Sequence, residues 1–392
     1  MPSSAATPRR PHGPALALVA AMKTSNRHFV PPHCPNRDCP HHRNPAGWHF
    51  TRAGHFRRKA SPTRIRRFRC SACGRWFSTQ TFDTTYWLKR PRLQREIWNR
   101  LVECVAHRQA GRGLRAVHST IQRQAERLGR HALLFHAMMG PRRLPEEDLV
   151  LDGVQTFEHS QYWPCDFNLV VGAKSHYLHG FTDAELRRSG RMTKAQKRKR
   201  ARLEARHGRP DPKATEREVE ALLRIVLKEE RLPAKRPFVL RTDEHRAYPR
   251  ALRRLGLPQV EHRTTSSRAA RTPLNPLFAA NVAEMLVRHC TSAHKRETIA
   301  FVKRRQAGAE RLAVFQVWRN FMKAASERDP KGPTPAMRAK VLDRWVTLQE
   351  LFHRRLFPTL IELPARLAAY YWREVPTRVI RNGRRHRLKY AF

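Results

Sequence analysis

Acidic residues are scarce in this sequence of 392 residues, which has 32 Asp and Glu against 79 Lys and Arg and a formal net charge of +47. A cationic surplus of this size indicates a polyanionic partner, because each neutralised phosphate releases condensed counterions. A basic surface of the ribosomal type, or one that only keeps the chain in solution, is the alternative. The deficit of acidic residues is strongest in residues 1–145, which contain five acids and 28 Lys and Arg. This first third is therefore predicted to contact DNA.

Long apolar runs are also missing. No stretch approaches the roughly 20 apolar residues that a membrane-spanning helix needs, so no membrane partner is expected. The short apolar segment 14–22 follows two arginines and weakly resembles a signal peptide, but a cationic, cysteine-bearing sequence comes after it. We therefore expect residues 1–31 to form a disordered tail, with Met22 as an alternative start.

Cysteine is infrequent, and four of the seven cysteines form two close pairs, Cys34-x4-Cys39 and Cys70-x2-Cys73. Paired thiols in a basic chain favour a metal site over disulfides, and a reducing compartment. Two such pairs on tight turns can surround Zn²⁺ tetrahedrally, and four thiolates leave no open position for water. The predicted role of zinc is therefore structural, and cysteines without metal are the alternative.

The region around these pairs, residues 32–86, is predicted to be a zinc ribbon. His41 and His42 are competing ligands close to the first pair, although four thiols already complete the shell. The hydrophobic core of such a region is too small to keep it folded without the metal ion. The expected core consists of Trp48, Phe50, Phe68 and Trp76.

Two helices are expected next, over residues 92–109 and 119–139. The first has an apolar stripe at helical spacing, and the second begins at Ser119-Thr-Ile-Gln122, which has the form of a capping box. A glycine-containing segment joins them in a basic context. This pattern predicts a helix-turn-helix-like DNA-binding region over 87–140, with an ordinary helical hairpin as the alternative.

From residue 148 the pattern changes to short apolar runs that predict strands, so the fold class is α+β or α/β with several domains. A Lys- and Arg-rich insertion, 187–212, is read as a solvated or disordered segment or as a DNA-contacting arm. Expected strands cover 149–157, 167–173, 176–181, 238–242 and 260–264. Expected helices cover 215–232, 276–304, 336–356 and 358–372.

Three carboxylates stand in this region. Asp152 lies inside the apolar run LVLDGV, where a carboxylate is costly unless it binds a cation. Asp243 follows the apolar run FVLRT directly, and Glu284 lies on the expected helix 276–304. Two strand carboxylates and one helix carboxylate can converge on a pair of Mg²⁺ ions, which prefer oxygen ligands.

These features together resemble bacterial insertion-sequence transposases of the DDE type, over roughly residues 30–320. The resemblance rests on the four cysteines, on the LVLDGV strand with Asp152, on Thr242-Asp243 and on Asn281-x2-Glu284. It implies a zinc ribbon, a helix-turn-helix and an RNase H-like mixed sheet with flanking helices over 146–320.

The resemblance also implies function. It implies DNA strand cleavage and transfer with Mg²⁺ or Mn²⁺ held by Asp152, Asp243 and Glu284, on terminal inverted repeats and target double-stranded DNA. It further implies a homodimer or larger assembly and a cytoplasmic, nucleoid-associated bacterial protein. Glu297 is the alternative third acid. Residues 333–392 match nothing in the family and are expected to be helical with a basic tail.

Two other functions stay open. One is a DNA-binding protein derived from a transposase that has lost its catalytic site. The other is a different RNase H-like nuclease, which would cleave with water alone. All three functions predict zinc and salt-sensitive DNA affinity, and only a transposase predicts strand transfer into a new target.

Overall fold

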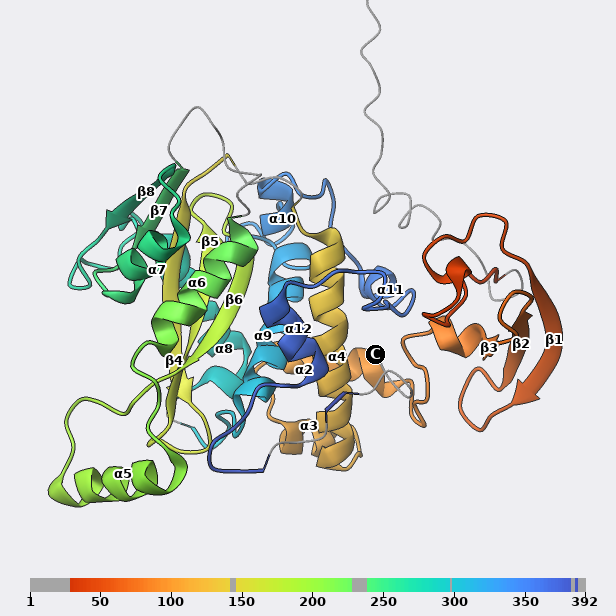
Figure 1. The fold of residues 1–392 in the computed structure, drawn as a ribbon, viewed down its shortest axis with the longest axis horizontal. Helices are drawn as coiled ribbons and strands as arrows, with labels where there is room; N and C mark the ends of the chain where they lie inside the picture. The colour runs from red at the N-terminus through yellow and green to blue at the C-terminus, as the bar shows by residue number, and fades with distance from the viewer. Residues whose placement is uncertain (1–28, 142–145, 228–237, 297, 382–384, 387–392) are drawn as a thin grey trace, which may run out of the picture. The chain divides into compact units, whose positions relative to one another are not determined.

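The computed structural model describes residues 29–141, 146–227, 238–296, 298–381 and 385–386. The chain is a mixed α+β protein that divides into two compact units, each described here by itself (Figure 1). The smaller unit comprises residues 1–86 and 347–355, and the larger comprises 87–346 and 356–392. The expected tail, 1–31, lies almost wholly outside the described residues. Over the described ranges, no helix is long and apolar enough to cross a membrane.

The smaller unit is built on an antiparallel sheet of β1 (Phe50–Arg57), β2 (Arg64–Cys70) and β3 (Trp76–Ser78), in that order. Along β2, Phe68 and Cys70 share one buried face, Ile65 is buried on the other, and Arg64, Arg67 and Arg69 are exposed. The sheet has an aromatic core with neighbouring ring centroids 5.1 to 6.2 Å apart. Its members are Phe29, Trp48, Phe50, Phe68, Phe77 and Phe82.

Trp76 was expected in this core, and that prediction is wrong. The Trp76 side chain is 55% exposed, and Phe77 is buried in its place. Successive residues of a strand face opposite sides of the sheet, so a burial prediction that is one residue out selects the wrong side chain. The Arg67 and Arg69 guanidinium groups lie 5.6 and 5.9 Å from the Trp76 ring centroid, which makes this face of the sheet cationic.

A segment from far along the chain, Thr347–Arg355, completes the smaller unit. The Arg355 backbone N–H donates to the Phe82 carbonyl at 2.7 Å, and the Thr84 hydroxyl donates to the Phe352 carbonyl at 3.4 Å. Arg355 also donates a side-chain hydrogen bond to the carbonyl of Thr81. The segment therefore belongs to the smaller unit by direct hydrogen bonding.

The prediction of one helix over 336–356 is wrong, because part of this range, Thr347–Arg355, belongs to the smaller unit. The structure has only two single turns there, α10 (Pro335–Arg338) and α11 (Leu348–Leu351). Each turn begins at a threonine whose hydroxyl accepts from the backbone N–H three residues on, and these capping boxes fix two separate starts. The helix expected over 358–372 is shorter, as α12 (Ala365–Trp372).

The larger unit is built on a five-stranded mixed sheet in the order β6-β5-β4-β7-β8. The hairpin strands β4, β5 and β6 pair antiparallel, whereas β7 and β8 run parallel to β4. As a result, β4, β6, β7 and β8 all run in the same direction. The strands are β4 (Leu149–Phe157), β5 (Pro164–Gly172), β6 (Leu178–Glu185), β7 (Phe238–Thr242) and β8 (Val260–Thr264).

Helices cover both faces of this sheet. Leu149 and Leu151 of β4 share a buried apolar cluster with α6 (Ala214–Val226) and with α7 (Ala247–Leu255). On the opposite face, α8 (Phe278–Cys290) packs against β4 and β5, and α9 (Arg305–Phe321) packs against β6. Because side chains alternate along a strand, Asp152 points to the α8 face.

The helices before the sheet also belong to the larger unit. The single helix expected over 92–109 is two, α2 (Leu93–Val102) and α3 (His107–Gly113), separated at Cys104, which has a φ of +60°. The next helix, α4 (His118–Met139), is buried along most of its length against α9. At Gly129 an added Cβ would lie 2.6 Å from the Cβ of Glu310, so the glycine permits this close approach.

Two further expectations about helices change. The helix expected over 276–304 ends at Cys290, where the backbone of Thr291 turns extended (φ −123°, ψ 114°). The basic insertion contains a regular helix, α5 (Lys194–His207), which is capped by Thr193. The helix expected over 215–232 is shorter, as α6, and ends at Val226, because Leu227 has non-helical backbone angles (φ −97°, ψ 71°).

A buried ion network joins the sheet to α9. The Arg305 guanidinium donates to Glu158 at 3.1 Å, to Asp183 at 2.8 Å and to Glu185 at 2.6 Å. Asp183 is fully buried and also accepts from Arg366 at 2.8 Å. Arg305 thus bridges three carboxylates inside the fold, and Arg366 and Arg378 supply further positive charge.

We expect Arg305→Met to lower the free energy of unfolding of the larger unit by about 3–5 kcal/mol, because it leaves buried carboxylates without their counter-charge. Urea unfolding followed by tryptophan fluorescence measures this loss. The control is Arg224→Met, which removes an arginine from an exposed pair with Glu220 and should cost less than about 1 kcal/mol. Equal losses in the two variants would contradict this role of Arg305.

A buried histidine should make stability depend on pH. Burial lowers the pKa of His136 to about 4, and its Nε2 lies 3.1 Å from the Tyr177 hydroxyl and 3.2 Å from the Asn320 amide. The unfolded chain takes up the proton near pH 6.5, whereas the folded chain stays neutral, so stability falls as pH drops from about 6.5 to 4.

The expected loss at pH 5 is about 2 kcal/mol relative to pH 7, since each unit of separation is worth about 1.4 kcal/mol. His136→Gln removes this titration, so the variant should not lose this part of its stability at pH 5. The free energy of unfolding of the wild type minus that of the variant should therefore decrease by about 2 kcal/mol from pH 7 to pH 5. A difference that stays constant with pH would rule out His136 as the cause.

Candidate functional sites

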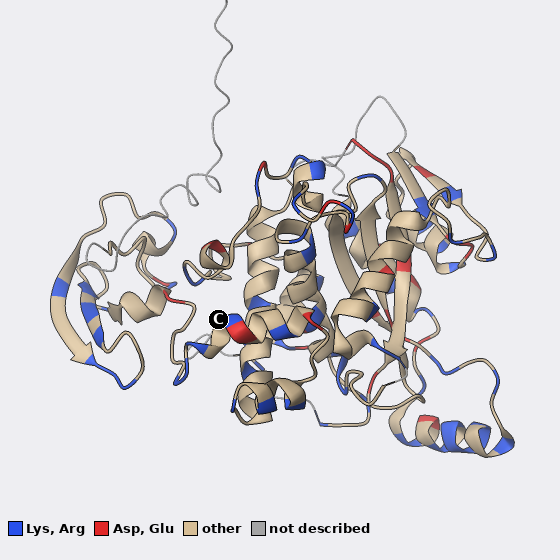
Figure 2. Cartoon of the chain, turned by 180° about the vertical axis from the view of Figure 1, so that it is seen from behind, with Lys and Arg blue, Asp and Glu red and all other residues tan. Residues whose placement is uncertain are grey.

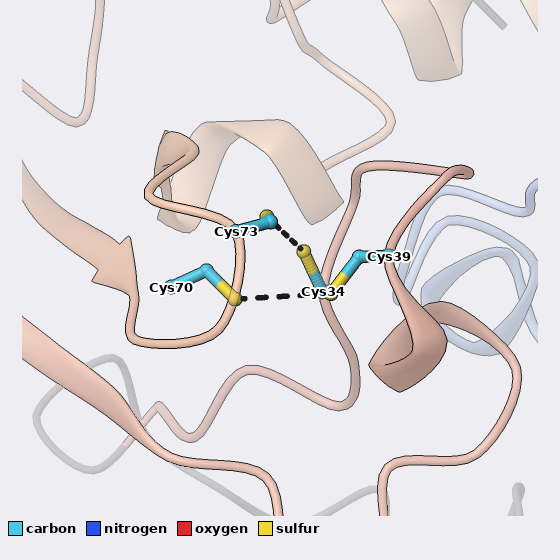
Figure 3. Close-up of side chains that lie close together, drawn as sticks. All are labelled: Cys34, Cys39, Cys70 and Cys73. Carbon is cyan, nitrogen blue, oxygen red and sulfur yellow. Dashed lines mark hydrogen bonds between the residues drawn. The ribbon is translucent and has the colours of Figure 1, made fainter.

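The four paired cysteines come together in the smaller unit (Figure 3). The sulfur atoms of Cys34, Cys39, Cys70 and Cys73 all lie within 4.8 Å of one another. Cys34 Sγ is 3.6 Å from Cys73 Sγ, and Cys39 Sγ is 4.0 Å from Cys70 Sγ. A tetrahedron with Zn–S bonds of about 2.3 Å has S···S edges of about 3.8 Å. The cluster therefore fits a metal ion such as zinc.

Local backbone geometry holds each pair on a tight turn. The Gly74 N–H donates to the Cys70 carbonyl at 3.0 Å, and Gly74 has a φ of +69°, which glycine adopts without strain. The Trp48 indole N–H donates to Cys70 Sγ at 3.3 Å, which supports negative charge on that sulfur. Burial raises the pKa of the Cys34 thiol, so a buried thiolate here requires a cation.

The neighbouring histidines support the cysteine cluster from outside it. His42 Nδ1 lies 2.7 Å from the Cys34 carbonyl, and His33 Nδ1 lies 2.9 Å from the same oxygen. His41 Nδ1 lies 3.3 Å from the Asn44 carbonyl. These ring nitrogens are engaged with backbone oxygens, and the group of potential ligands consists of the four cysteines.

Asp152 and Asp243 occupy matching positions on adjacent strands. The parallel pair β4 and β7 aligns Leu149 with Leu240, and each aspartate lies three residues beyond its aligned leucine. Asp152 Oδ1 accepts from the Gly153 N–H at 2.7 Å, and Asp243 Oδ1 accepts from the His245 N–H at 2.9 Å. The pairing register thus brings the two predicted acids side by side.

Glu284 reaches the same place from α8. Its carboxyl group is hydrogen-bonded to that of Asp152. Burial and then the charge of Asp152 raise the pKa of Glu284 to about 9, so Glu284 holds a proton and donates to Asp152 at neutral pH. Burial also raises the pKa of Asp152, with the nearby charge of Asp243 adding to it. All three predicted acids therefore meet.

These acids line one cavity of about 440 Å³. Asn281, Glu284 and Arg288 lie one helical turn apart on α8 and share the face that lines it. Arg288 also donates to the Gln155 carbonyl at 3.2 Å, which fixes its position beside β4. The cationic side chains of the cavity wall are Arg271, Arg288 and Arg296.

A fourth acid, Asp166, lies close by and was not predicted. An added Cβ on Gly153 would lie 2.3 Å from Asp166 Oδ2, so Gly153 leaves room for this carboxylate. Burial and then the charge of Asp152 raise the pKa of Asp166 to about 7. Its Oδ1 is buried without a hydrogen-bond partner among the described residues. Asp166 does not line the cavity, and it adds negative potential beneath Asp152.

The sequence did contain a signal for Asp166. An acid inside an apolar strand is the feature that identified Asp152, and Asp166 lies in the run CDFNLVV. The expected strand began at Phe167, whereas β5 begins at Pro164, so Asp166 was placed in a loop.

The alternative third acid, Glu297, lies outside the described residues, and α8 has ended before it, at Cys290. Among the described residues, the cysteines form the only group of three or more potential ligands that all lie within 4.8 Å. The carboxylates are spaced more widely around their cavity. In comparisons with known proteins, no family model matches this chain and no curated protein matches it.

Proposed function

We propose that the protein is a metal-dependent DNA strand-cleaving and strand-joining enzyme of the DDE type, with Asp152, Asp243 and Glu284 as the ligands of its metal ions. The observation that carries the proposal is the convergence of these acids on one cavity, at a place where their burial and mutual repulsion call for a cation. Only 32 acids occur in the whole chain, so their gathering here is selective.

The topology of the larger unit supports an RNase H-like catalytic domain. Three antiparallel strands followed by two parallel ones, in the order β6-β5-β4-β7-β8, have the strand and helix sequence that the resemblance implies. The first acid lies on the central strand and the second at the end of its parallel neighbour. The third lies on the helix that packs against the central strand.

Carboxylates are the ligands that Mg²⁺ and Mn²⁺ prefer. When bound, such ions would lower the pKa of an attacking water or 3′-hydroxyl and stabilise the leaving oxygen. Asp152 and Asp243 would hold them from the sheet, and Glu284 would give up its proton to bind. Three carboxylates that line one cavity, with Asp152 and Glu284 in contact, could together hold a pair of ions. Arg271, Arg288 and Arg296 would then orient the phosphate at the cavity mouth.

The smaller unit supports the same function as a zinc ribbon that contacts DNA. The cysteine cluster can fix its fold, and its exposed strand face carries arginines from β2. Cations distributed on a rigid sheet bind the phosphate backbone without reading sequence. We infer that this unit contributes affinity for duplex DNA.

The decisive experiment incubates the purified protein with Mg²⁺, DNA from either side of its coding region, and a supercoiled target plasmid. A transposase produces nicks at defined ends and joins those ends to the plasmid. Nicking without joining would indicate a nuclease. Salt-sensitive binding without nicking would indicate a DNA-binding protein without catalytic activity. Binding without either reaction, at any Mg²⁺ or Mn²⁺ concentration, would refute the enzymatic proposal.

A further inference from the structure

The helix α5 is an unusually basic surface that the catalytic site does not use. It leaves the sheet after β6 and carries a dense series of Lys and Arg residues (Figure 2). No residue of α5 is buried. The strands β4, β6 and β7 run in the same direction, and Glu185 at the end of β6 is level with Thr156 of β4, four residues beyond Asp152.

One face of α5 is tied to the larger unit. Arg187 makes two hydrogen bonds with Glu204, at 2.9 and 3.0 Å, and Arg200 donates to the Arg188 carbonyl at 2.7 Å. The Lys199 ammonium lies 5.2 Å from the centroid of the Tyr162 ring. Two of these contacts are made within the insertion, by Arg187 and Arg188, and the third joins α5 to Tyr162 in the connection between β4 and β5.

The other face is an uninterrupted row of exposed cations at every fourth position, which we call the outer stripe: Lys194, Arg198, Arg202 and Arg206. Residues four apart on a helix are neighbours about 6 Å apart along the axis, and like charges at this spacing destabilise the helix. A polyanion with regularly spaced charges would remove this repulsion. The helix lacks an apolar face, so insertion into a lipid surface is disfavoured.

A separate groove lies at the root of α5. It has a volume of about 230 Å³ and is lined by Arg187 and Arg209 from the α5 segment and by Arg246 and Arg250 around α7. His245, also in its wall, is two residues from Asp243. The acids of the groove are already neutralised by arginine partners. The pairs are Glu185 with Arg378, Asp211 with Arg217, and Glu216 with Arg254.

We propose that the outer stripe and this groove form a binding track for the phosphate backbone of duplex DNA, which extends from the catalytic cavity to α5. Its role in catalysis rests on the proposed function, and its role in binding does not. DNA held at the carboxylates would continue along the groove, and α5 would contact its flank. Such contacts fix orientation and add affinity without sequence preference.

The test measures binding of a long labelled duplex without Mg²⁺ over a range of NaCl concentrations. The variant carries Lys194→Gln, Arg198→Gln, Arg202→Gln and Arg206→Gln. The slope of log affinity against log salt should fall by about 3 to 4, because each lost phosphate contact removes about 0.9. The matched control replaces four exposed cations at the opposite edge of the sheet, near the start of β4: Arg328, Lys331, Arg338 and Lys340.

An unchanged slope in the α5 variant, or an equal fall in the control, would overturn the proposal. So would α5-dependent binding to phosphatidylglycerol vesicles with DNA affinity unaffected. A protein that binds DNA through α5 but never cleaves it would refute the proposed enzymatic function and leave the binding track intact.

Discussion

Replacing Asp152 by Asn should lower the rate of Mg²⁺-dependent DNA strand cleavage by about three orders of magnitude. Asn keeps the size of the side chain and removes one negative charge from the group that would hold the metal ions. A bound metal ion contributes several kcal/mol to the stabilisation of a phosphoryl-transfer transition state, and each 1.4 kcal/mol is a factor of ten in rate. Asp243→Asn should have an effect of similar size, since its carboxylate lies at the matching position of the adjacent strand.

Glu284→Gln distinguishes loss of chemistry from loss of fold. Glutamine can donate the same hydrogen bond to Asp152 that protonated Glu284 donates, so the melting temperature should not fall. It cannot become an anion, so cleavage should fall as steeply as with Asp152→Asn. Nicking of a supercoiled plasmid, measured with a thermal melt of each variant, gives both quantities.

The matched control is Asp148→Asn. Asp148 lies just before β4 and pairs with Arg241 at 2.6 Å, away from the cavity that the three acids line. Its removal should cost less than about 1 kcal/mol of stability and leave cleavage unchanged. If Asp152→Asn cleaves as fast as Asp148→Asn, the assignment of the metal site is wrong.

Three of the five strands could be predicted well because short runs of apolar and β-branched residues mark them in the sequence. The expected limits of β4, β7 and β8 agree with the structure residue for residue. Pairing could not be predicted from these patterns, and it is the pairing of Leu149 with Leu240 that brings two of the acids together. Asp166 was missed because the predicted strand began three residues after the true start of β5, which placed this buried carboxylate in a loop.

Helix ends were predicted less well because contacts distant in sequence decide them. No glycine or proline near Thr291 marks a helix stop in the sequence, although the backbone turns extended at this residue (φ −123°, ψ 114°). Likewise, Val346 donates to the Phe321 carbonyl at 2.9 Å, so the chain after α10 is extended against α9. The expected helical C-terminal region is therefore largely irregular over its described part, and most of the basic tail from residue 381 lies outside it.

Removal of the metal from the cysteine cluster should unfold the smaller unit and leave the larger one folded. The smaller unit has a three-stranded sheet and one cluster of aromatic rings, a core too small for stability on its own. Structural zinc contributes about 10 kcal/mol or more to domains of this kind. Cys39→Ser removes a buried ligand and should act like a chelator, abolishing one equivalent of zinc per chain.

Near-ultraviolet circular dichroism measures this directly, because the packed rings of Phe29, Trp48 and Phe77 lose their fixed environment when the sheet opens. Limited trypsin digestion should cut at the β2 arginines only in the metal-free protein. Cys104→Ser is the control, since Cys104 lies in the larger unit outside the cluster. If the metal-free chain kept its near-ultraviolet signal and its protease resistance, the cysteines would not be what holds the smaller unit together, and its stability would have to come from the Thr347–Arg355 segment that hydrogen-bonds to it.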